Sequence, residues 1–133
     1  MKKAVIFDLF GVLVIRDTAN AELIELVAEL KKKGIKIFVL SNADVELAAQ
    51  QMKKYPFINE LADKFYYSGQ SGFIKPDPRA YKVVLEENNL KPEECIYFDD
   101  GESRVAAAQT LGIESYLFVG VEDVRNKVAK LLK

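Results

Sequence analysis

The chain has no histidine and a single cysteine, Cys95, among its 133 residues. Catalysis by Ser-His-Asp or Cys-His groups needs an imidazole, and ordinary zinc sites need histidine or several cysteines, so these classes are excluded. Cys95 has no partner for an internal disulfide and opens the apolar run 95–98, which is typical of a small buried side chain. Any acid or base must therefore be Asp, Glu, Lys or Tyr.

Long hydrophobic runs are also missing, and no small-residue cleavage site follows the first residues. Neither sign of charge dominates, because 19 Lys and Arg face 20 Asp and Glu. This balance gives no broad attraction to nucleic acid or to an anionic membrane, and we expect a cytoplasmic protein without such partners. Half of the residues are hydrophobic, which is enough to bury the core of one domain over residues 1–133.

Apolar runs that end at polar or turn residues predict strands covered on both faces. Such runs occupy 4–7, 35–40, 95–98 and 115–119, with a shorter candidate at 64–67. Helical spacing, glycine stops and a proline start predict helices at 23–33, 45–54, 78–87, 103–111 and 121–132. Strict alternation of strand and helix predicts a Rossmann-like three-layer α/β/α sandwich around a five-stranded, mostly parallel sheet.

Polar residues directly follow three of the predicted strands: Asp8, Ser41 and Asp99. Because the carboxyl ends of parallel strands share one edge of the sheet, these side chains should meet in a crevice there. A strand-end acid followed by a glycine turn at Gly11 can act as a nucleophile on phosphorus or carbon. Taken alone, Asp8 is more typical of a helix cap.

Ser41 begins a segment suited to binding an anion. Its hydroxyl and the backbone N–H groups of Asn42 and Ala43 can hold an anionic oxygen where a helix starts. The tetrapeptide Ser-Asn-Ala-Asp at 41–44 is equally typical of a helix N-cap.

A lysine and an acid pair complete the set. Lys75 precedes a rigid Pro-Asp-Pro segment that can fix its ammonium near Asp8 and a phosphoryl group. Asp99 and Asp100 are adjacent acids of the kind that bind Mg²⁺. Each feature has an ordinary structural explanation, but their order and placement together predict one catalytic crevice.

Four segments in this order resemble the motifs of the haloacid dehalogenase-like (HAD) superfamily: 7–13, 40–42, 75–78 and 97–100. The resemblance extends from Val5 to about Gly112. It implies that Asp8 is the nucleophile and that Ser41, Asn42 and Lys75 orient a phosphate. It also implies a Mg²⁺ site formed by the carboxylates of Asp8, Asp99 and Asp100 and the backbone carbonyl of Phe10.

Phe10 is a departure from the family's phosphatases, which carry a second aspartate two residues after the nucleophile. General acid–base assistance is typically worth about 10²–10⁴-fold, so we expect a weak phosphatase or one limited to acyl and aryl phosphates. The family's dehalogenases have an aromatic residue at this place, which makes carbon–halogen hydrolysis an alternative. A third alternative is a binding or scaffold domain without turnover. Asp100, Glu102, Tyr67 and Tyr81 are the residues whose type suits a water-activating base.

Cap domains in the family are inserted between the first three motifs. Here the intervals from Asp8 to Ser41 and from Ser41 to Lys75 have room for one helix and its flanks, so we expect a capless, open site. Such a site implies a macromolecular substrate, or a phosphorylated small molecule enclosed by a second subunit. Arg104 stands where many relatives have Asp or Asn, and it can compete for the carboxylates, bind a substrate phosphate or lie in solvent.

Overall fold

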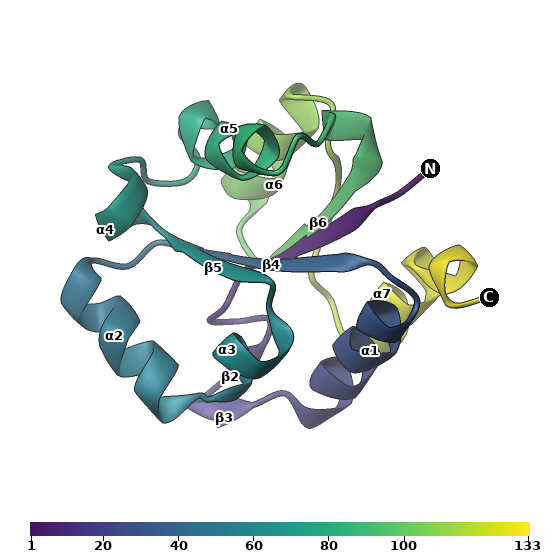
Figure 1. Cartoon of the computed structure of the whole chain (residues 1–133), viewed down its shortest axis with the longest axis horizontal. Coiled ribbons are helices and arrows are strands. Elements are labelled where there is room, and N and C mark those ends of the chain that lie inside the picture. The colour runs from purple at the N-terminus through teal and green to yellow at the C-terminus, as the bar shows by residue number, and fades with distance from the viewer.

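A sheet of five parallel strands forms the centre of the computed structural model, which describes all residues from Met1 to Lys133. The strand order is β5-β4-β1-β6-β7, and Figure 1 shows the sheet crossing the middle of the molecule. The strands are β1 (Ala4–Phe7), β4 (Lys36–Ser41), β5 (Lys64–Tyr67), β6 (Cys95–Asp99) and β7 (Glu114–Leu117). All five predicted strands are present, every pairing is parallel, and the predicted fold class is confirmed.

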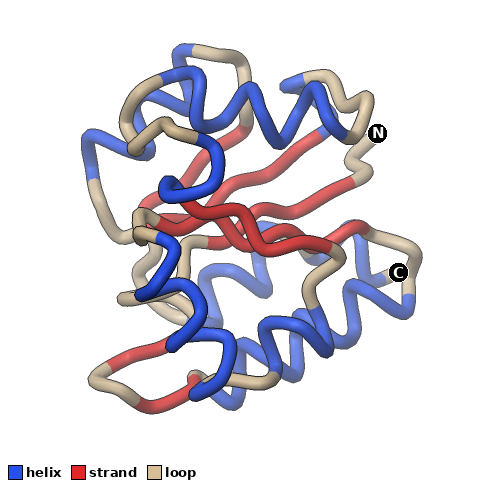
Figure 2. The backbone as a smooth tube through the Cα atoms, turned by 60° about the vertical axis from the view of Figure 1, so that its left-hand side comes forward, coloured by secondary structure: helices blue, strands red, loops and turns tan.

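Helices cover both faces of the sheet because alternate residues of its strands point in opposite directions. Along β1, Val5 and Phe7 belong to one buried core, whereas Ala4 and Ile6 belong to the other. The first core is covered by α1 (Ala21–Lys32), α2 (Val45–Lys54), α3 (Phe57–Leu61) and α7 (Val121–Lys127). The second is covered by α5 (Pro78–Glu87) and α6 (Glu102–Thr110), and Figure 2 shows helices on both sides of the strands. None of these helices combines the length and the apolar character that crossing a bilayer requires.

Several short elements interrupt the predicted alternation. A hairpin of β2 (Val14–Ile15) and β3 (Thr18–Ala19) stands between β1 and α1, α3 lies between α2 and β5, and α4 (Ser68–Ser71) follows β5. The prediction of strict alternation is therefore wrong. The prediction of one helix per interval is confirmed between Asp8 and Ser41, where α1 is the helix, and is wrong between Ser41 and Lys75, where α2, α3 and α4 lie. The predicted helix 121–132 also breaks at Val128 into α7 and a 3₁₀ turn, Ala129–Leu132, and a second 3₁₀ turn is Pro92–Glu94. Elements of two to five residues are too short for their periodicity to appear in a sequence.

The strand order places the candidate site at the middle of the sheet. The chain runs from β1 outward through β4 and β5, then crosses back to β6 and β7 on the other side. Phe7 at the end of β1 is in register with Val39 and Phe98, so Asp8 and Asp99 follow at the same level. The carboxyl ends of strands at such a switch point form the usual binding crevice of this architecture.

Candidate active site

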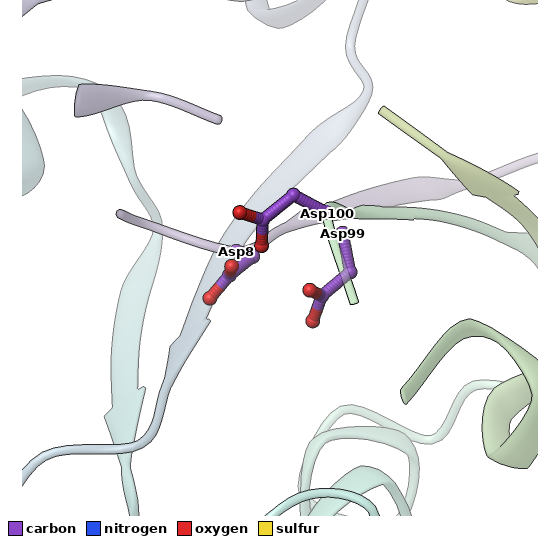
Figure 3. A group of neighbouring side chains, drawn as sticks. All are labelled: Asp8, Asp99 and Asp100. Carbon is purple, nitrogen blue, oxygen red and sulfur yellow. The ribbon is translucent and has the colours of Figure 1, made fainter. Parts of the chain in front are cut away.

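Three aspartates meet beyond the ends of β1 and β6. One carboxylate oxygen from each of Asp8, Asp99 and Asp100 lies within 4.8 Å of the others. Figure 3 shows Asp100 reaching back over the end of β1 toward Asp8. Asp8 and Asp99 are buried, whereas the Asp100 side chain is 42% exposed. The structure thus brings together the three carboxylates that the family resemblance predicts as metal ligands.

Lys75 lies between two of these acids. Its Nζ is 2.9 Å from Oδ1 of Asp8, 3.1 Å from Oδ2 of Asp99 and 2.7 Å from the carbonyl oxygen of Leu40. The Lys75 side chain is only 1% exposed. A buried ammonium held by several oxygen atoms is fixed in position, so it can stabilise negative charge without reorganisation.

Asn42 holds the backbone of Lys75 in place just before α5. The backbone N–H of Lys75 donates to Oδ1 of Asn42 over 2.9 Å, and Nδ2 of Asn42 donates to the Lys75 carbonyl over 3.1 Å. Asp77 caps α5 by accepting a hydrogen bond from the Arg79 N–H, with Pro78 at the first helical position as predicted. The side-chain amide of Asn42 is therefore committed to Lys75, and Asn42 positions the lysine.

Asp99 has a complete set of partners although its side chain is fully buried. Besides Lys75, it accepts hydrogen bonds from the Tyr97 hydroxyl, from the Gly101 N–H over 2.9 Å and from Nε of Arg104 over 3.0 Å. Burial opposes ionisation, but Lys75 and the hydrogen bonds from Tyr97 and Gly101 hold the pKa of Asp99 below its usual value. Asp99 is therefore a fixed anion.

Tyr97 is the site residue that sequence reasoning missed, because it lies within an apolar strand run. Its hydroxyl is 3.3 Å from Nζ of Lys75 and donates to Asp99. A usable signal was present: residues two apart in a strand point to the same face, so Tyr97 had to share a face with Asp99.

Burial has the largest effect on the pKa of Asp8. It raises the pKa of Asp8 to about 7, with Lys75 acting in the opposite direction and Asp99 adding to the rise. A carboxylate displaced from water is less stabilised by solvation than an exposed one. Near neutral pH, the charge on Asp8 therefore depends on the cations around it.

Ser41 ends β4 as a buried residue, but the predicted anion site beside it is incomplete. The N–H of Ala43 donates to Oγ of Ser68 over 2.9 Å, so the predicted use of this N–H for an anion is wrong. Asp44 caps α2 by accepting a 2.7 Å hydrogen bond from the N–H of Leu47, which confirms the N-cap alternative for this segment.

Phe10, two residues after Asp8, has no titratable group. Phe10 is 41% exposed, and its ring and that of Tyr55 form a T-shaped pair with centroids 6.3 Å apart. Of the residues suggested as bases, Tyr81 is fully buried, donates to the Arg104 carbonyl over 2.8 Å and has a pKa raised by burial. Tyr67 packs against Phe65. Glu102 is exposed at the start of α6, and Asp100 is the candidate that belongs to the acid cluster.

A family of haloacid dehalogenase-like hydrolases matches this sequence over residues 2–112. Among curated proteins, a phosphatase from Mycobacterium tuberculosis is 32% identical over 89 residues, which are 67% of this chain and 41% of that protein. A phosphorylated carbohydrates phosphatase from Thermotoga maritima is 32% identical over 85 residues, 64% of this chain and 39% of that protein. The chain thus spans about two fifths of these relatives.

Solved structures share the whole fold. A predicted HAD-like hydrolase from Porphyromonas gingivalis has a TM-score of 0.84 at 20% identity, covering 100% of this chain and 98% of that one. A HAD-family enzyme from Bacteroides thetaiotaomicron, crystallised as a variant with magnesium and inorganic phosphate, has a TM-score of 0.73 at 19% identity. The match covers 88% of this chain and 94% of that enzyme.

Proposed function

Because the chain belongs to the haloacid dehalogenase-like hydrolases, we propose that it is a Mg²⁺-dependent phosphohydrolase in which Asp8 attacks phosphorus. The main support is the buried contact of Lys75 with both Asp8 and Asp99, with Asp100 alongside. A domain with a purely structural role would not need a buried ammonium between two carboxylates. The similarity to phosphatases from two bacteria supports the choice of phosphorus.

The residues present suit Mg²⁺, which prefers carboxylate oxygens and water. Asp8, Asp99, Asp100 and the backbone carbonyl of Phe10 would hold the ion, and magnesium in the structurally similar Bacteroides enzyme supports this assignment. When bound, Mg²⁺ polarises phosphoryl oxygens and offsets the charge of the acids.

The chain's own residues account for the two covalent steps. A carboxylate oxygen of Asp8 forms a bond to phosphorus, and the bond to the leaving oxygen breaks with its electron pair. Lys75 and the Ser41 hydroxyl orient the phosphoryl oxygens, and Lys75 neutralises their charge. Water then attacks phosphorus, releases phosphate and restores the Asp8 carboxylate.

Phe10 limits the substrates. Because it holds no proton to give, the leaving oxygen departs as an anion, which favours acyl and aryl phosphates over alkyl phosphates. The substrate is a phosphorylated small molecule or macromolecule. For a small molecule, we propose that a second copy of the chain encloses the open site and excludes water.

Carbon–halogen hydrolysis is the second candidate, and Phe10 is the feature that favours it, since halide leaves without a proton. In that reaction Asp8 attacks carbon and no metal is needed. Chloride or fluoride release that persists in EDTA, without phosphate release from any phosphate compound, would replace the first proposal by this one.

The test is release of p-nitrophenol from p-nitrophenyl phosphate by wild type and Asp8→Asn, each with Mg²⁺ and with EDTA. We expect wild-type turnover that EDTA abolishes and that Asp8→Asn lacks. Normal turnover by Asp8→Asn would remove Asp8 as nucleophile. Absence of all hydrolysis, with retained Mg²⁺ or phosphate binding, would indicate a binding domain.

A further inference from the structure

Arg104 lies against the acids proposed for the metal. Its Nε is 3.0 Å from Oδ1 and 3.1 Å from Oδ2 of Asp99, and its terminal nitrogen is 3.1 Å from Oδ1 of Asp100. The guanidinium of Arg104, in the first turn of α6, therefore contacts both members of the acid pair. It uses the carboxylate oxygens that a metal ion would need.

The absence of a side chain at Gly101 leaves room for the Arg104 guanidinium in this position. A Cβ at residue 101 would collide with the Arg104 guanidinium, which folds back over the glycine. The φ of Gly101 is −102°, which any residue can adopt. The glycine is thus required for the position of the arginine side chain and not for the backbone of the turn.

Lys75 and Arg104, the two cationic side chains at the site, differ in how freely they can move. Lys75 is 1% exposed and is enclosed by Asp8, Asp99 and backbone, whereas the Arg104 side chain is 30% exposed. Arg104 can leave for solvent without crossing the core. Asp99 would keep its contacts with Lys75 and Gly101 after this movement.

We propose that Arg104 is a built-in competitor of Mg²⁺, which closes the metal-free site and must swing away from Asp99 and Asp100 before the ion binds. This inference rests on the Mg²⁺ site of the proposed function and assigns to Arg104 the role of lowering the affinity of that site for the ion. A guanidinium and a divalent cation are attracted to the same carboxylates and repel each other, so each lowers the occupancy of the other. The chain would then bind Mg²⁺ weakly and release it readily.

The test is calorimetric titration of Mg²⁺ alone into the metal-free full chain, without substrate. Arg104→Gln removes the competing charge, and Gly101→Ala keeps the charge but displaces the guanidinium. Both variants are expected to bind Mg²⁺ at least about tenfold more tightly than wild type. Arg125→Gln is the matched control, because Arg125 pairs with Glu29 at the surface over 3.2 Å, and its Mg²⁺ affinity should equal that of wild type.

In NMR spectra, the Nε–H resonance of wild-type Arg104 should shift as Mg²⁺ is added. Unchanged or weaker affinity in Arg104→Gln and Gly101→Ala, with measurable binding by wild type, would overturn this proposal alone and assign Arg104 to orienting the acids. Failure of every protein to bind Mg²⁺ would overturn both this proposal and the metal dependence of the proposed function.

Discussion

The Lys75 ammonium lies 2.9 Å from Oδ1 of Asp8, although 67 residues separate the two in the chain. Their side chains are 1% and 9% exposed, so the pair is almost sealed from water. Removing the Lys75 ammonium would leave the buried carboxylates of Asp8 and Asp99 without their shared cation, which costs far more than breaking a surface pair, whereas removing Asp8 leaves Lys75 paired with Asp99. The contact that prepares the nucleophile is therefore also a strong constraint on stability.

Lys75→Met should lower the free energy of unfolding by about 3–5 kcal/mol, because Asp8 and Asp99 lose their shared cation. Urea unfolding monitored by circular dichroism measures this loss. Lys64→Met is the matched control: Lys64 pairs with Glu87 at the exposed surface, so its loss should cost far less than the loss of Lys75. Equal losses in the two variants would contradict the importance of the buried ammonium.

Asp8→Asn should raise the melting temperature of the metal-free protein near neutral pH. The folded-state pKa of Asp8 is raised to about 7 from 3.8, so the folded state binds the extra proton and wild-type stability falls as pH rises through this interval. Asparagine has no such titration. The advantage of the variant should grow from about pH 4 to about pH 7 and then level off.

Melting curves in EDTA across this pH range test the prediction. In a chain of this size, each kcal/mol corresponds to roughly 4 °C in melting temperature. Asp17→Asn, at an exposed loop position, serves as the control for the Asp-to-Asn substitution itself. A constant difference between Asp8→Asn and wild type at all pH values would contradict a raised pKa for Asp8.

Phe10→Asp should increase kcat/KM for an alkyl phosphate by about 10²-fold or more, since it supplies a proton donor where the ring now stands. The gain for p-nitrophenyl phosphate should be smaller, because its leaving group needs less protonation. Phe10→Asn removes the ring without adding an acid and serves as the control. An equal gain in Phe10→Asn would assign the effect to access to the site.

Gly11→Ala should weaken Mg²⁺ binding, because a Cβ there would collide with the Asp100 carboxylate. Gly72→Ala is the matched control: both glycines have positive φ, +89° and +85°, but nothing lies within 4 Å of a Cβ at Gly72. Each variant should lose about 1–2 kcal/mol of stability from the left-handed backbone. The rise in melting temperature on adding Mg²⁺ should be reduced in Gly11→Ala alone, and an equal rise in both would contradict the assignment of Asp100 to the metal.

Local patterns in the sequence determined the elements of the fold and the acids at its edge. The apolar runs before Asp8, Ser41 and Asp99 form β1, β4 and β6, because strands buried on both faces are rich in apolar residues. Pro78 begins α5 as predicted, since its fixed φ suits the first helical position. Parallel pairing then brought Asp8 and Asp99 to one edge.

Tertiary structure alone decided how these residues are used. Two features depend on segments far apart in the chain: the burial of Lys75 against Asp99 and the hydrogen bonds between Asn42 and the Lys75 backbone. The contact of Arg104 with Asp99 depends on the rotamer of the arginine side chain. The Ala43 N–H is likewise taken by a serine 25 residues away. Residue type and spacing determine which strands and helices form, but the partner of each polar group is set by how the elements pack, which no local pattern records.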